Sequence, residues 1–132
     1  MAEIVVALGI VIVLISGLIV GATSAVRTND QSRLRSLAVG YVQEALELTR
    51  KLRDESWDTF QVKNGLWCLD KAGVWTQAVV TCPSNIDSVF TRGVTFSWNA
   101  GALRMDITAR VSWQDGAATH QSSLITFFTQ WQ

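Results

Sequence analysis

Residues 4–26 read IVVALGIVIVLISGLIVGATSAV, and no other stretch of the chain is as apolar. The stretch has no charged residue, and its only non-apolar members are Gly, Ser and Thr. As a helix, about 23 residues rise roughly 34 Å, which matches a hydrocarbon core about 30 Å thick. The thirteen Ile, Leu and Val residues within 4–20 favour insertion by roughly 4–8 kcal/mol. The stretch therefore predicts one membrane-spanning helix.

A cleaved signal peptide is the main alternative for this stretch. Signal peptides begin with basic residues and have a shorter apolar core, whereas this segment begins with Glu3 and is long. The small residues 22–25 offer a weak cleavage site, and cleavage there would leave a secreted binding domain. Glu3 itself is a functional candidate, because a carboxylate next to an apolar span lowers the favourable insertion energy. The plainer interpretations are a carboxylate in the headgroup region or one that compensates the helix dipole.

The sequence from residue 27 to about residue 57 continues as an amphipathic helix. Its apolar positions recur with spacings of four and three, which is typical of a helix that lies on a partner surface. This stripe consists of Leu34, Ala38, Tyr41, Ala45, Leu48 and Leu52. We therefore expect a single long helix with an apolar half, 1–26, and an amphipathic half, 27–57, followed by a head formed by 58–132.

Three glycines lie inside the apolar half. Gly17 and Gly21 have the GxxxG spacing that allows close approach of apolar helices, and Gly9 lies one turn after the start of the run. A local loss of helix within 17–24 is the alternative, since glycine weakens a helix in water by about 1 kcal/mol relative to Ala.

After residue 57 the apolar pattern changes to a period of two. Residues 103–113 alternate most clearly, and 94–98 form a second alternating run before a turn at 99–101. A turn at 114–117 leads to a strand over 120–128, whose two faces the sequence does not assign. We expect a three-stranded antiparallel meander, covered on its apolar face by the helical stripe. Residues 66–69 and 74–80 are candidate short strands in a looser region.

Cys68 and Cys82 are the two cysteines of the chain. A membrane segment precedes them, which makes an oxidising compartment and a disulfide the leading interpretation. Such a bridge closes a loop of about 15 residues and contributes roughly 3 kcal/mol. Two buried free thiols are the alternative.

The composition argues against catalysis and against nucleic-acid binding. Eleven basic and eleven acidic residues balance, so no long-range field attracts a polyanion. We expect no enzyme, no metal site and no cofactor, because His120 is the only histidine and no phosphate-binding loop is present. A basic strip of Arg92, Arg104 and Arg110 on the polar sheet face is the weaker hypothesis for DNA binding. The tryptophans are expected in the core and at subunit interfaces, with surface adhesion as an alternative; they are Trp57, Trp67, Trp75, Trp98, Trp113 and Trp131.

Residues 2–10, AEIVVALGI, resemble the start of the mature helix in the type IV pilin and pseudopilin superfamily. The C-terminal segments 109–116, ARVSWQDG, and 129–131, TQW, are similar to minor pilin-like heads. The resemblance implies an α+β, pilin-like fold: a long N-terminal helix packed on a small antiparallel sheet. It also implies a leader removed by a prepilin peptidase, a methylated N-terminus, and a glutamate at the fifth mature position. Glu3 matches that glutamate two positions early, so either a leader and two residues precede Met1 or the numbering begins at an internal Met.

The resemblance further implies a structural subunit of a type IV pilus or pilus-like filament. Its partners would be copies of itself, related subunits and an inner-membrane assembly machinery, and Glu3 would pair with the amine of a neighbour. The filament-core residues would be Ile4, Val5, Leu8, Ile12, Leu14, Ile15 and Leu18. The head would be extracytoplasmic, although Arg27, Arg33 and Arg35 alone favour the opposite orientation. A single-pass anchor that displays a binding head without polymerising is the alternative function.

Overall fold

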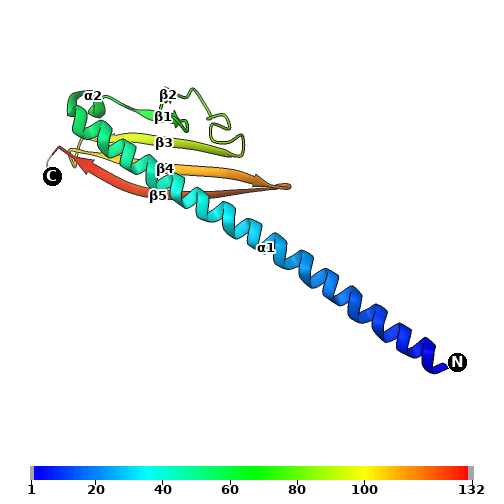
Figure 1. Cartoon of the computed structure of the whole chain (residues 1–132). Coiled ribbons are helices and arrows are strands. Elements are labelled where there is room, and N and C mark those ends of the chain that lie inside the picture. The colour runs from blue at the N-terminus through cyan, green and yellow to red at the C-terminus, as the bar shows by residue number, and fades with distance from the viewer. Residues whose placement is uncertain (1, 131–132) are drawn as a thin grey trace. The chain divides into compact units, whose positions relative to one another are not determined.

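A computed structural model of the chain describes residues 2–130, so Met1 and Trp131 lie outside the described part. The elements are helices α1 (Ala2–Glu55) and α2 (Trp57–Gln61), then strands β1 (Gly65–Leu69), β2 (Trp75–Gln77), β3 (Phe90–Asn99), β4 (Arg104–Asp115) and β5 (Ala118–Thr129) (Figure 1). The chain divides into two compact units at the boundary between Leu34 and Arg35. The predicted α+β class is confirmed, with a long N-terminal helix and an antiparallel sheet.

The first unit consists of the N-terminal part of α1, and its helix is continuous. The alternative of a local loss of helix over 17–24 is wrong, because α1 runs through this stretch without interruption. An added Cβ at Gly17 or Gly21 would meet nothing within 4 Å. Packing within the chain therefore does not require glycine at these positions.

In the second unit, the C-terminal part of α1 covers one face of the sheet (Figure 1). The six residues of the predicted stripe are all buried or half-buried, which confirms the helical spacing. Val42 and Thr49 are also fully buried and were missed, because the covered face is wider than the stripe. Thr49 is accommodated there because its hydroxyl donates a hydrogen bond to the Ala45 carbonyl at 2.7 Å.

The end of α1 differs from the expectation of a helix to about residue 57. The helix ends at Glu55, and Ser56 adopts extended backbone angles and caps a new helix, α2. The Ser56 hydroxyl accepts a hydrogen bond from the Thr59 amide at 3.4 Å, as serine commonly does at helix N-termini. The break lets Phe60 enter the core, where its ring lies 5.9 Å from that of Phe96.

The sheet has five antiparallel strands in the order β2-β1-β3-β4-β5. The predicted meander is present as β3, β4 and β5, and the two short segments extend the same sheet. The alternation along β4 is confirmed from Met105 to Trp113, all of whose inward residues are buried. Leu103 is an exception: it lies in the turn with a φ of 49° and is 69% exposed.

Cross-strand register assigns the two faces of β5, which the sequence left open. Met105 is paired with Phe128, so Phe128 faces the covered side and is buried. Ile125 and Phe127 have the opposite parity and point outward, where they are 78% and 54% exposed. In the pair Phe127-Phe128, the cross-strand partner rather than hydrophobicity decides which ring is buried. Leu124 has the inward parity but is 40% exposed.

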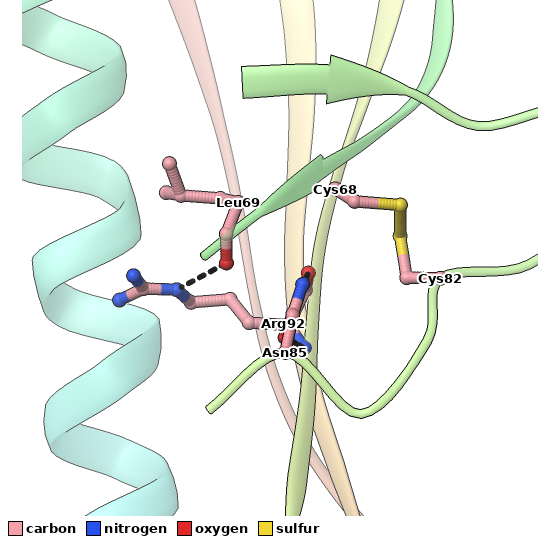
Figure 2. Close-up of a disulfide and its surroundings, with 5 residues drawn as sticks. All are labelled: Cys68, Leu69, Cys82, Asn85 and Arg92. Atoms are coloured by element: carbon pink, nitrogen blue, oxygen red, sulfur yellow. Dashed lines mark hydrogen bonds between the residues drawn. A yellow bond between two sulfur atoms is a disulfide. The ribbon is translucent and has the colours of Figure 1, made fainter. Parts of the chain in front are cut away.

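The disulfide between Cys68 and Cys82 is present, which excludes the alternative of two free thiols (Figure 2). It lies against β3 at Gly93, the partner of Cys68 in the sheet. A Cβ at Gly93 would approach the Cys82 sulfur to 3.3 Å and a Leu66 methyl group to 3.0 Å. A side chain at Gly93 would therefore displace the Leu66 methyl group and the Cys82 sulfur by a few tenths of an ångström.

The double substitution Cys68→Ser with Cys82→Ser should lower the free energy of unfolding by about 3 kcal/mol, because the unfolded chain regains the entropy of a closed loop. The measurement is denaturant unfolding of the full chain in detergent, followed by Trp fluorescence. The parent protein in reductant serves as the control and should match the variant. An unchanged unfolding midpoint in both samples would contradict this role of the bridge.

Candidate functional site

The candidate site is the apolar segment of α1 together with the carboxylate at its start. The thirteen large apolar side chains between Ile4 and Val20 are 48–74% exposed. They point to all sides of the helix, including the seven predicted filament-core residues Ile4, Val5, Leu8, Ile12, Leu14, Ile15 and Leu18. A helix that is apolar all round requires surroundings that are apolar all round. By length and composition α1 is able to cross a membrane.

Two polar side chains in this segment, those of Ser16 and Thr23, form hydrogen bonds within the helix. The Ser16 hydroxyl donates to the Ile12 carbonyl at 2.8 Å, and the Thr23 hydroxyl lies within reach of the Ile19 and Val20 carbonyls. In a hydrocarbon environment an unsatisfied hydroxyl costs free energy, whereas these two are already paired. The segment is thus suited to an apolar environment despite its hydroxyl groups.

Glycines leave part of this helix surface without protruding side chains. At Gly9, Gly17 and Gly21 an added Cβ would lie in open space. Gly17 and Gly21 are one turn apart and therefore share a face, where another helix can approach closely. Any close approach at these glycines must come from another chain or from lipid, since this chain places nothing there.

Glu3 lies in the first turn of α1, where a negative charge interacts favourably with the helix dipole. Within residues 2–130 no basic side chain forms an ion pair with it. The carboxylate is therefore available to a cation supplied from elsewhere.

A buried arginine, Arg92, holds the elements of the head together (Figure 2). Its guanidinium donates to the carbonyls of Leu69 (3.1 Å), Tyr41 (3.4 Å) and Asp70, and pairs with the Glu44 carboxylate at 2.7 Å. These groups belong to α1 and to the end of β1. A charge with no solvent contact is tolerable because each of its nitrogens has a partner.

The backbone of Arg92 fixes a third segment, the loop before β3. The Asn85 side chain accepts from the Arg92 amide and donates to the Arg92 carbonyl, both at 2.8 Å. One residue thus joins the helix, the strand β1 and this loop. The hypothesis of a basic strip on the polar face is wrong for Arg92, since it is buried on the helix side.

The sequence pattern around Arg92 indicates that this residue is buried. Arg92 has the same parity in its strand as Val94 and Phe96, which face the core. The period of two therefore placed it inside, and a charge at an inward position indicates a buried network.

The other two arginines of the proposed strip have different surroundings. The Arg104 guanidinium lies 2.8 Å from the Asp106 carboxylate and 4.7 Å from the centre of the Phe127 ring. Arg110 is exposed on the outer face of the sheet. The three side chains do not form one basic surface.

An exposed ion pair joins the β1–β2 turn to the loop before β3. The Lys71 ammonium lies 2.7 Å from the Asp87 carboxylate, which also accepts from the Tyr41 hydroxyl at 3.3 Å. Hydrogen bonding to Lys71 lowers the pKa of Asp87, and hydrogen bonding to Asp87 raises the pKa of Lys71. Asp87 and Ser88 both have positive φ angles, 50° and 56°, so the pair holds a tight turn.

The tryptophans occupy several environments. Trp113 is 6% exposed and stacks on His120 with ring centres 5.6 Å apart. Trp57, Trp67 and Trp75 are half-buried, and Trp98 is 37% exposed. Only Trp113 is thus a core residue among the described tryptophans.

Two observations concern metal binding and the chemistry of the cysteines. Residues 2–130 contain no group of three His, Cys, Asp or Glu side chains that could hold a metal ion. Cys68 and Cys82 are bonded to each other, so neither supplies a thiolate for a Cys–His pair.

Replacing Arg92 by Met should lower the free energy of unfolding by about 3 kcal/mol, because the Glu44 carboxylate and the carbonyl groups lose a buried donor. Glu44→Gln should cost less, about 1 kcal/mol, because the Glu44 side chain is 48% exposed. Denaturant unfolding checks both values. Arg110→Met, the same change at an exposed position, is the matched control. Equal losses of unfolding free energy at Arg92 and Arg110 would contradict this structural role of Arg92.

The Lys71–Asp87 pair should stabilise the head only between its two titrations. The lowered pKa of Asp87 means that this contribution is lost as the pH falls below about 3.8, the ordinary value. The raised pKa of Lys71 means that it is lost as the pH rises above about 10.5. Unfolding midpoints of the parent and of Asp87→Asn, measured against pH, should differ slightly near neutrality and converge at both extremes. A constant difference at every pH would exclude the ion pair as its source.

A comparison with models of protein families found no match to this chain. Comparisons with curated proteins and with solved structures also found none.

Proposed function

We propose that this chain is a structural subunit of a type IV pilus or pilus-like filament, which inserts in a membrane before assembly. The observation that carries the proposal is the exposed apolar surface of residues 4–20, which the described part of the chain does not bury. A bilayer covers this surface before assembly, and the same helices of neighbouring copies cover it in the filament. The resemblance of residues 2–10 to the mature pilin helix supports the same assignment.

Two further features support helix-on-helix assembly. Gly17 and Gly21 leave open space on one face, which lets a neighbouring helix approach closely. The head has its own buried core and a disulfide, and none of the buried core residues belongs to the apolar segment. The role is structural, and no catalytic step or cofactor belongs to it.

Glu3 sets the axial register in this proposal. A carboxylate beside an apolar helix is costly, and the N-terminal amine of a neighbouring copy would compensate it. A pairing partner that is available in only one relative position of two helices fixes that position, as buried polar groups do in coiled coils. The related subunits and the assembly machinery of the inner membrane are the further partners, and the head lies outside the cytoplasm.

Glu3→Ala and Glu3→Leu should leave membrane insertion unchanged and reduce filament number at least tenfold, because the subunits lose their register contact. Insertion is measured by resistance to alkaline extraction, and filaments are counted by electron microscopy of cells that contain the assembly machinery. Glu55→Ala, which removes an exposed carboxylate at the C-terminal end of α1, is the matched control.

Normal filaments from both Glu3 variants would contradict the register role. If the parent chain forms no fibres and stays monodisperse in detergent, the filament proposal fails and a non-polymerising membrane anchor replaces it.

A further inference from the structure

The outer face of the sheet, opposite to α1, carries a pocket that the filament proposal does not use. Its floor is formed by β3 and β4, and its wall by Leu66 of β1 and the loop residues 80–82. Four hydroxyl residues and one arginine line it together with Gly93: Thr91, Thr95 and Ser112 of the floor, Thr81 of the loop, and Arg110. The pocket lies entirely within the second unit of the chain.

Sheet register explains why these side chains meet. Thr91 is paired with Ser112, and Gly93 with Arg110, so the hydroxyl and guanidinium groups project from neighbouring positions of one face. Gly93 has no side chain, and the Leu66 methyl group and the Cys82 sulfur lie over it, at 3.0 Å and 3.3 Å from the position of a Cβ. The floor therefore carries polar groups on both of its strands, and the wall lies directly against Gly93.

The wall of the pocket is held in place covalently. Cys82 belongs to the lining, and its bond to Cys68 fixes the loop above the strand. Leu66 and Val80 make this wall apolar. The pocket thus has an apolar side and a polar floor, as sites for small polar ligands commonly have.

The charge in the pocket is a single cation. Arg110 forms no ion pair in the described part of the chain, and Asp106, on the same face, is already paired with Arg104 at 2.8 Å. A planar guanidinium recognises a carboxylate with two parallel hydrogen bonds. One cation is too few for a polyanion, which needs several contacts along its backbone.

We propose that this pocket binds a sugar that carries one carboxylate, with Arg110 on the carboxylate. Hydroxyl side chains both donate and accept hydrogen bonds, so Thr91, Thr95 and Ser112 suit the hydroxyl groups of a sugar ring. Leu66 and Val80 suit its apolar C–H face. The proposal is independent of filament assembly, since every lining residue lies in the head.

The test is a titration of the full chain with sodium glucuronate, followed by NMR of the amide groups of Thr91, Gly93, Arg110 and Ser112. The detergent is a polyoxyethylene type, which carries neither sugar nor charge. The expected dissociation constant is on the order of 1 mM, as for a small ligand in an open pocket. Glucose, acetate and inorganic phosphate are titrated in parallel, and each should bind about tenfold more weakly.

Two variants locate the binding. Arg110→Gln should weaken glucuronate binding about tenfold, and Thr95→Val should weaken it severalfold by removing a hydroxyl at nearly constant shape. Arg35→Gln makes the same charge change at an exposed helical position and should leave binding unchanged.

Three results would overturn the proposal. Acetate or phosphate that binds as tightly as glucuronate shows a plain anion contact instead of a sugar site. Equal binding by the parent and Arg110→Gln places the ligand elsewhere. Amide shifts that do not change up to about 20 mM glucuronate, well above the expected dissociation constant, show that the pocket does not bind this class of ligand.

Discussion

The large apolar side chains between Ile4 and Val20 are not buried by any of the residues 2–130, and their need for an apolar environment is the main physical constraint on the molecule. In water such a surface drives insertion or association, at roughly 25 cal/mol for each Å² that is removed from solvent. The internal pairing of the Ser16 and Thr23 hydroxyls lets the same surface enter hydrocarbon without a polar penalty. A bilayer and neighbouring apolar helices can each bury this surface. The same sequence is therefore compatible with membrane insertion followed by polymerisation.

The proposed filament role requires a head that stays folded while the apolar segment changes its surroundings. The core between α1 and the sheet is small, and two devices compensate for its size. Arg92 ties the helix, strand β1 and the Asn85 loop together through groups that have no other common partner. The disulfide closes the loop on the other face of the same strands. One device uses charge in the interior and the other a covalent bond at the surface, so the two act on different parts of the head.

The two faces of the sheet carry different kinds of side chain. Along β3 and β4, inward positions are apolar with the single exception of Arg92, whereas outward positions are mostly hydroxyl-bearing or charged. The outer face also includes the exposed Ile125 and Phe127 of edge strand β5. A face with hydroxyl groups, one unpaired guanidinium and a wall fixed by the disulfide is suited to small-ligand recognition, while the inward side chains of β3 and β4 belong to the core.

The sequence alone determined the elements whose signal is local. The long apolar helix, its amphipathic continuation and the alternation along β4 follow from periodicity, because side-chain spacing on a helix or strand is a property of the backbone. The disulfide was favoured among alternatives by context. Tertiary structure alone decided the outward side of β5, the place of Leu103 in a turn, the break at Ser56 and the partners of Arg92. Each of these depends on which residues far apart in the chain become neighbours, and no local pattern encodes the register that brings them together.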